Sequence, residues 1–228
     1  GGLGGVFTVR SLSDVDAMAR DFSQGRSVLV IGGGYIGLEA AAVAAKLGLK
    51  VTVLEKAIRI LQRVAATETS DYFRALHRKN AVQIREDTGL KRLLGVEGRV
   101  TAVELDTGEI IEIDFVVVGI GVRPNDGLAT AAGLKTDDGI LVDGACRTSD
   151  PAILAAGDCA RFPLGDGLGR LESVQNAVDQ GEAAAESLAG HYVDYRPAPW
   201  FWSDQFDVKL QIAGLNTGYD RTVKRPGK

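Results

Sequence analysis

Three glycines with a fixed spacing are the residues in this sequence best placed to take part in chemistry. Gly32, Gly34 and Gly37 form a G-x-G-x-x-G pattern that follows the apolar run SVLVI and opens an alanine-rich stretch. The first glycine permits a tight turn, the second lets the backbone approach a pyrophosphate, and the third lets a helix pack closely on a strand. The phosphates would then lie at a helix N-terminus, where free N–H groups and the helix dipole favour an anion. The pattern predicts a dinucleotide-binding turn, to which Tyr35 and Ile36 also belong.

An acid further along the chain strengthens this prediction. Glu55 ends a second apolar run, 51–54, at about the 20-residue distance from the glycines that suits hydrogen bonds to an adenosine ribose. A carboxylate facing the 2′-phosphate of NADP would be a like-charge contact, so the sequence favours NAD. Lys56, Arg59 and Arg63 lie nearby and could weaken this preference, or they could be solvated loop cations.

Three other residues each have two interpretations. Glu39 stands in the otherwise apolar run YIGLEAAAVAA, and the residues alone favour an acid stabilised by the helix dipole in the first turn. Tyr35 could cover the cofactor or be an ordinary packed aromatic. Asp158 follows Gly157 at the end of the run ILAA, where ligands collect in open α/β sheets, but it could equally cap a turn.

The sequence offers few candidates for a general acid or a general base. His77 is expected to face outward and His191 to follow a helix end, so neither is favoured as a general base. Two cysteines, Cys146 and Cys159, are too few for a disulfide framework and are predicted to be small hydrophobic residues in a reducing, cytoplasmic setting. No metal-ligand cluster is visible in the sequence. Any catalysis would therefore depend on a cofactor.

The elements that position these residues alternate between strand and helix. A strand at 27–31, a helix at 36–47 and a strand at 51–54 predict a right-handed βαβ unit with parallel strands. The segments that continue this order are a helix at 67–79, a strand at 82–84, an antiparallel meander of 90–94, 99–105 and 109–113, and a buried strand at 115–119. Beyond residue 127 the pattern predicts strands at 140–142, 153–156 and 208–212 and a helix at 172–188.

Composition narrows the possible partners. The chain has 228 residues, with 26 basic and 30 acidic side chains and a formal net charge of −4. Such a balance gives no electrostatic footprint for nucleic acid or for an anionic membrane surface. No apolar run approaches the roughly 18 residues of a membrane-spanning helix. We therefore expect a globular protein with neither nucleic acid nor membrane as a partner.

Several segments of the sequence resemble one family, the FAD- and NAD(P)-dependent pyridine nucleotide oxidoreductases, and specifically the ferredoxin reductases of the putidaredoxin and rhodocoxin systems. The segments that carry the resemblance are VLVIGGGYIGLEAAA (28–42), VTVLEKAIRIL (51–61), GIGVRPN (119–125), RTSDPAILAAGDCA (147–160), RLESVQNAVDQG (170–181) and PWFWSDQFD (199–207). Disulfide reductases share the earlier segments but not PWFWSDQ, so the last two are the more specific.

The resemblance implies an α/β fold with a Rossmann-like NAD-binding domain, an inserted antiparallel β-meander, and part of an FAD-binding Rossmann-like domain. The implied divisions are a linker at 1–9, the NAD-binding domain at 10–125, the C-terminal part of the FAD-binding domain at 126–198, and the start of a C-terminal dimerisation or interface domain at 199–228. The family's first G-x-G-x-x-G, which holds the FAD adenosine, is absent. We therefore expect a piece of a longer reductase that binds FAD poorly by itself.

The resemblance also assigns roles to single residues. It implies that Asp158 binds the flavin ribityl chain and that Ser173, Val174 and Gln175 lie against the isoalloxazine. It places Trp202 beside the flavin near the electron exit, although Trp200 and Trp202 could instead pack a domain interface. On the NAD side it implies that Glu39 and Gly121 lie near the nicotinamide and that Arg63 approaches the adenosine.

The activity implied is hydride transfer from NADH to FAD, followed by single-electron transfer to a [2Fe-2S] ferredoxin that serves an oxygenase. The alternatives are an NADH oxidase, a nitrite reductase flavoprotein component, or a non-enzymatic NADH-sensing module similar to apoptosis-inducing factor. The basic residues that could face an acidic ferredoxin, or simply be solvated, are Lys209, Arg221, Lys224 and Arg225.

Overall fold

The structure, a computed structural model, describes residues 2–225. These residues form two compact units. The first contains the chain up to Gly121 together with Ser203–Leu210 and the described residues from Asn216 onward. The second contains Val122–Trp202 and Gln211–Leu215.

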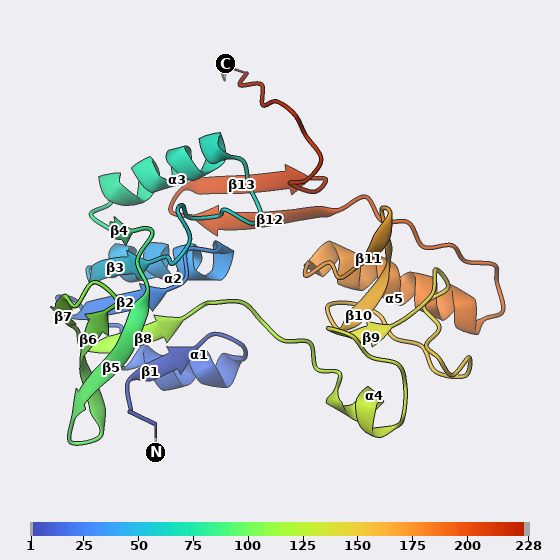
Figure 1. Cartoon of the computed structure of the whole chain (residues 1–228), viewed down its shortest axis with the longest axis horizontal. Coiled ribbons are helices and arrows are strands. Elements are labelled where there is room, and N and C mark those ends of the chain that lie inside the picture. Colours follow the sequence, from blue (N-terminus) through green and yellow to red (C-terminus); the bar gives the residue numbers. More distant parts are fainter. Residues whose placement is uncertain (1, 226–228) are drawn as a thin grey trace. The chain divides into compact units, whose positions relative to one another are not determined.

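A parallel sheet of five strands forms the centre of the first unit, in the order β1-β8-β2-β3-β4 (Figure 1). Its strands are β1 (Val6–Thr8), β2 (Ser27–Ile31), β3 (Lys50–Leu54), β4 (Gln83–Arg85) and β8 (Phe115–Val118). The helices of this unit are α1 (Leu12–Ala19), α2 (Tyr35–Lys46) and α3 (Thr67–Lys79). The parallel pairing of β2 with β3 confirms the predicted βαβ unit. β1 lies within residues 1–9, the stretch predicted as a linker, and adds an edge strand to the sheet.

The central strands are apolar throughout because both faces of the sheet are covered. Val28 and Val30 of β2 point into a core that they share with Leu38 of α2 and Phe73 of α3. Leu29, between the two valines, points into the other core. Alternation along a strand sends neighbouring side chains to opposite faces, so a continuous apolar run indicates burial on both.

An antiparallel meander covers this second face. Its strands are β5 (Leu90–Val96), β6 (Arg99–Leu105) and β7 (Ile110–Glu112), paired in the order β5-β6-β7. Val103 and Leu105 of β6 join Leu29 in the second core. The predicted insertion of a meander before β8 is confirmed.

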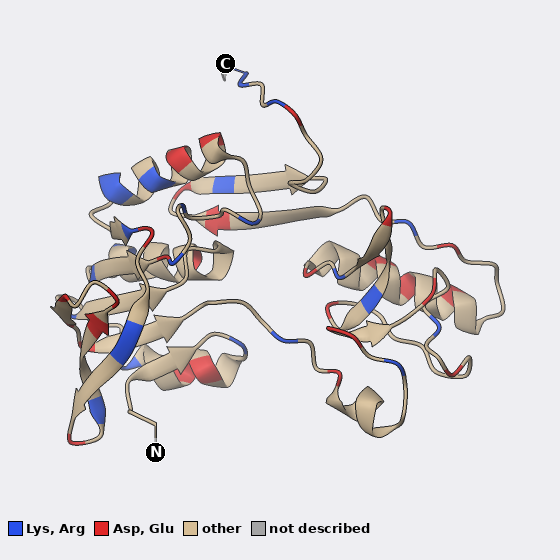
Figure 2. Cartoon of the chain, viewed as in Figure 1, with Lys and Arg blue, Asp and Glu red and all other residues tan. Residues whose placement is uncertain are grey.

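A C-terminal hairpin consists of β12 (Trp200–Gln205) and β13 (Val208–Ala213), and its Ser203–Leu210 portion belongs to the first unit. Figure 1 shows β13 beside α3. The sequence predicted a strand at 208–212 but not β12. α3 has an acid, Glu68, in its first turn and basic residues in its last, as Figure 2 shows, which complements the helix dipole.

The second unit has less regular structure. It contains α4 (Gly127–Ala131), α5 (Val174–Leu188) and a small sheet in the order β11-β10-β9, whose strands are β9 (Ile140–Leu141), β10 (Ala160–Leu164) and β11 (Gly167–Gly169). The strand predicted at 153–156 is wrong: only an isolated bridge joins Leu154 to Arg147. β10 and β11 were not predicted. Among residues 2–225, no helix has the length and apolar character to cross a membrane.

Candidate functional site

The turn between β2 and α2 accepts only glycine at two of its positions. Gly32 has φ +106°, and a Cβ there would lie 2.3 Å from the carbonyl oxygen of Gly119. A Cβ on Gly37 would lie 1.9 Å from the carbonyl oxygen of Gly32, so α2 rests directly on the turn. Gly34, at the N-cap of α2, has no atom within 4 Å of its Cβ position. The turn is therefore closed on its packed side and open at the N-terminus of the helix.

Glu55 is held beside this turn by two backbone donors. Its Oε2 accepts a hydrogen bond from the N–H of Gly33 at 2.7 Å, and its Oε1 accepts one from the N–H of Ala57 at 2.7 Å. The side chain is partly buried. A carboxylate has about four acceptor positions, so each oxygen keeps one for a further donor such as a ribose hydroxyl.

The first residues of α2 differ in exposure. Tyr35 is half-buried, its ring packs against the first core, and its hydroxyl donates to the carbonyl of Val64 at 3.4 Å. Burial raises the pKa of Tyr35. These contacts fit the packed-aromatic interpretation, and a role for Tyr35 in covering a cofactor stays a prediction. Ile36 is 41% exposed at the open end of the helix.

The three cationic side chains that follow Glu55 differ in their contacts. Arg59 donates to the carbonyl of Ala65 at 2.9 Å and to the hydroxyl of Ser70 at 2.6 Å, so its guanidinium fastens the loop. Lys56 and Arg63 are exposed. Nη2 of Arg63 lies 3.8 Å from the position a Cβ would take on Gly121, which brings these two predicted residues together.

Glu39 and His77 lie in a polar cluster that sequence reasoning missed. Glu39 accepts a hydrogen bond from Ser203 of β12 at 2.6 Å. His77 was predicted to face outward, and this is wrong: it is fully buried and pairs with Gln205 of β12 at 2.9 Å. The hairpin covers the face of α3 that carries His77, a contact between distant parts of the sequence. Burial lowers the pKa of His77 below 6.5.

In the second unit, three of the predicted flavin-side residues line one cleft. Asp158, Ser173 and Val174 line a cleft of about 700 Å³ at the start of α5. Ser173 caps that helix by accepting from the N–H of Asn176 at 3.2 Å, and Val174 is 62% exposed. Gln175 is exposed and donates to Asp179 at 2.6 Å rather than lining the cleft.

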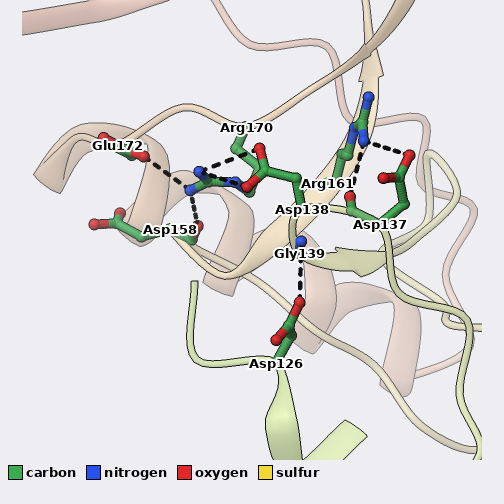
Figure 3. A network of polar contacts seen from close by, with 8 residues as sticks. All are labelled: Asp126, Asp137, Asp138, Gly139, Asp158, Arg161, Arg170 and Glu172. Atoms are coloured by element: carbon green, nitrogen blue, oxygen red, sulfur yellow. Dashed lines mark hydrogen bonds and ion pairs between the residues drawn. The ribbon is translucent and has the colours of Figure 1, made fainter. Parts of the chain in front are cut away.

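A set of ion pairs fixes the loops next to this cleft (Figure 3). Arg170 donates to the carbonyl of Asp158 and to Glu172, both at 2.9 Å, and reaches Asp138 at 3.5 Å. Arg161 donates to the carboxylate of Asp137 at 2.6 Å. The sequence analysis did not predict a role for Arg170, although its position two residues before Glu172 was a signal for the ion pair that the two form.

The remaining predicted residues are the two tryptophans of β12 and the basic residues named as partner candidates. Trp200 and Trp202 face the same side of β12, with ring centroids 5.3 Å apart, and Trp202 is 38% exposed. Lys209 lies 3.8 Å from Asp204. The other basic residues named as partner candidates are exposed: Arg221, Lys224 and Arg225.

Neither cysteine forms a disulfide in the described chain. Cys146 is buried, and burial raises its pKa to about 11, while Cys159 is partly buried. His191 is exposed and pairs with Glu186. Residues 2–225 contain no group of three or more histidine, cysteine or acidic side chains arranged to hold a metal ion.

Comparison with known proteins shows the family to which the chain belongs. The model of the pyridine nucleotide-disulphide oxidoreductases matches residues 2–181, most of the chain. The chain belongs to this family. A second model, the reductase C-terminal segment, matches residues 200–228. The family resemblance and the α/β fold class predicted from the sequence are thereby confirmed.

Individual relatives show which members of the family the chain is similar to over nearly its whole length. The chain is 47% identical over 227 residues to a ferredoxin–NAD(P)(+) reductase of Sphingomonas sp., covering 98% of this chain and 55% of the relative. It is 45% identical over 225 residues to rhodocoxin reductase of Rhodococcus erythropolis, covering 98% and 53%. The solved covalent complex of putidaredoxin reductase with putidaredoxin matches with a TM-score of 0.90 and 43% identity, covering 95% and 53%. The chain spans about half the length of the curated relatives it matches.

Proposed function

We propose that this chain is part of a flavoprotein that transfers a hydride from NADH to FAD and passes single electrons to a [2Fe-2S] ferredoxin serving an oxygenase. The observation that carries the proposal is the open helix start at Gly34, bordered by the carboxylate of Glu55. The choice of a ferredoxin as acceptor is supported by 47% identity to a ferredoxin–NAD(P)(+) reductase over nearly the whole chain.

On the NAD side, the residues have separate tasks. The amides at Tyr35 and Ile36 would meet the diphosphate where the helix dipole favours an anion. Glu55 would accept from the adenosine ribose, and its charge favours NADH over NADPH. Arg59 is occupied by backbone and hydroxyl oxygens, so Arg63 and Lys56 are the loop cations left to oppose that preference. Gly121 and Glu39 would lie toward the nicotinamide.

On the FAD side, the cleft at the start of α5 has the chemistry that part of a flavin nucleotide needs. Asp158 supplies a carboxylate for ribityl hydroxyls, and the N-terminus of α5 at Ser173 and Val174 supplies a positive dipole end. Gln175 and Trp202 complete the proposed set. Bound FAD would supply the hydride-accepting and one-electron chemistry, which no side chain provides. The protein residues would hold and orient it.

The domain assignment follows from these tasks. We assign residues 10–125 to NAD binding, 126–198 to FAD binding and 199–228 to the start of a C-terminal interface domain. The division between the units after Gly121 supports the first boundary. Lys209 and the exposed basic residues after it are proposed to face the acidic ferredoxin. A cytoplasmic location stays a prediction.

The experiment mixes NADH with the FAD-loaded protein in a stopped-flow spectrometer and follows the flavin absorbance. Cytochrome c reduction is then measured with and without an added [2Fe-2S] ferredoxin. We expect rapid loss of the oxidised flavin band, and cytochrome reduction only when the ferredoxin is present. Fast oxygen consumption without ferredoxin would instead indicate an NADH oxidase. NADH binding with no electron transfer to any acceptor would indicate an NADH-sensing module.

A further inference from the structure

β12 presents its polar residues in an unusual direction. Ser203 and Gln205 have no exposed surface, whereas Trp202 and Asp204, on the other side of the strand, are exposed. Alternation along a strand explains the two sides. It does not explain why the buried side carries a hydroxyl and an amide. Buried polar groups of this kind are costly unless they are hydrogen-bonded, so their partners show what they do.

The partners form one continuous row that ends at Glu39. Ser203 Oγ donates to Glu39 Oε1 at 2.6 Å, and Gln205 Nε2 donates to Ser203 Oγ at 3.1 Å. The row begins at His77, whose Nε2 lies 2.9 Å from Gln205 Oε1. His77 comes from α3 and Glu39 from α2, so the hairpin connects two helices of the first unit.

The direction of every hydrogen bond follows from the carboxylate. An ionised carboxylate only accepts, so the Ser203 hydroxyl must give its proton to Glu39. Its oxygen then accepts from the amide nitrogen of Gln205, which leaves the amide oxygen to accept from Nε2–H of His77. Reversing the Gln205 amide would set two oxygens against each other. The imidazole that begins the row is held by Phe206, whose ring packs edge-to-face at 4.9 Å.

The position of Glu39 is thus set by three fully buried residues. One carboxylate oxygen, Oε1, accepts the hydrogen bond from Ser203, and the side chain of Glu39 is half-buried. Ser203 and Gln205 both lie in the stretch that matches the reductase C-terminal segment, residues 200–228. A residue of that segment therefore reaches an acid on α2, the helix that follows the glycine turn.

We propose that Ser203, itself held by Gln205 and His77, is a positioning residue that orients Glu39 toward the nicotinamide carboxamide. The inference rests on the proposed function, because it requires a dinucleotide beside α2. The carboxamide N–H₂ is a donor, and Glu39 Oε2 is the acceptor that the Ser203 hydrogen bond leaves to it. The C-terminal hairpin would then control affinity for the nicotinamide half of the cofactor but not for the adenosine half.

The test compares two ligands by isothermal titration calorimetry on the full chain. NADH carries the nicotinamide, whereas ADP-ribose keeps the diphosphate and both riboses without it. For Ser203→Ala we expect the Kd for NADH to rise about tenfold. Without Ser203 the carboxylate of Glu39 would no longer be held in place to accept from the nicotinamide carboxamide, and a hydrogen bond to a charged group contributes at least that factor. The Kd for ADP-ribose should stay unchanged, which also shows that the variant is folded. Equal weakening of both ligands, or of neither, would overturn the proposal.

Two further variants sharpen the result. Ser203→Thr keeps the hydroxyl and should bind NADH like the unmodified chain. Asp204→Ala alters the neighbouring exposed residue of the same strand and should change neither Kd. If Asp204→Ala weakened NADH binding as much as Ser203→Ala, a general disturbance of the hairpin would be responsible and the proposal would be wrong.

A double variant tests whether Ser203 acts through Glu39. In a Glu39→Ala background, Ser203→Ala should cause no further loss, whereas independent roles would give additive losses. If the unmodified chain bound neither NADH nor ADP-ribose, the proposed function would fall. If it bound both and Ser203→Ala left NADH binding unchanged, only the role of Ser203 would be refuted.

Discussion

Two substitutions in the glycine turn should separate its packing task from its binding task. Gly37→Ala places a Cβ 1.9 Å from the carbonyl oxygen of Gly32, well inside the 3.0 Å below which real contacts essentially never occur. The obstacle is backbone, so α2 or the turn must move. Alanine gains about 1 kcal/mol of helix propensity over glycine, but overpacking costs about 1–3 kcal/mol and a backbone clash lies at the upper end. We expect a net loss of about 1–2 kcal/mol in unfolding free energy.

Gly34→Asp should do the opposite. The Cβ position at Gly34 is open, and Asp is a favoured N-cap residue beside a positive helix end, so the unfolding free energy should stay equal or rise by up to about 1 kcal/mol. The same charge would repel the diphosphate. Gly34→Asn is the matched control, because it has the same size and also caps helices but carries no charge. NADH should bind at least about tenfold more weakly to the Asp variant than to the Asn variant.

The assays are urea unfolding for stability and calorimetric titration with NADH for binding. A loss of 1 kcal/mol in Gly37→Ala should lower the melting temperature by about 2–4 °C. The reasoning is refuted if Gly37→Ala unfolds at the same urea concentration as the unmodified chain. It is equally refuted if Gly34→Asp and Gly34→Asn bind NADH alike.

Three other predictions use the same chain. Glu55→Gln removes the negative charge at the adenosine ribose, so the ratio of the Kd for NADPH to that for NADH should fall, and a calorimetric comparison showing an unchanged ratio would contradict the role of Glu55. Because burial lowers the pKa of His77 below 6.5, the unfolded state takes up a proton that the folded state does not. The unfolding free energy should therefore decrease as the pH falls from about 7 to 5.5, by at most ~1.4 kcal/mol per pH unit, and His77→Gln should flatten this slope in urea titrations at each pH; an equally steep slope in the variant would count against it. Asp158→Ala should retain less FAD than the unmodified protein after gel filtration, judged by the ratio of flavin to protein absorbance, whereas Asp137→Ala, an exposed acid that pairs with Arg161 outside the cleft, should retain as much.

The β2–α2 turn could be predicted because its determinants are local. Gly32, Gly34 and Gly37 lie within six residues, and the apolar runs on either side fix the strand and the helix. The two-sided burial of β2 and β8 also follows from their own residues. Prediction succeeded where a short stretch of sequence contains both the cause and the structure.

Prediction failed where the partner is distant in sequence. His77 stands among charged residues in RALHRKN, and nothing near it indicates burial. Its cover comes from Gln205 and Phe206, which join α3 only in the folded chain. The link from Ser203 to Glu39 was invisible for the same reason.

The second unit illustrates a different difficulty. β10 contains Pro163 and β11 is the glycine-rich Gly167–Gly169, so both segments have turn-like compositions. The run at 153–156 has strand-like residues but lies between turns and pairs through a single bridge. Short strands in irregular surroundings depend on tertiary pairing more than on propensity.

The most direct test of the central claim is a crystal structure of the chain with NADH. The account predicts a diphosphate within hydrogen-bonding distance of the amides at the start of α2, with the adenosine ribose hydroxyls on the carboxylate of Glu55. A dinucleotide bound elsewhere, or bound at this turn with its ribose turned away from Glu55, would contradict it.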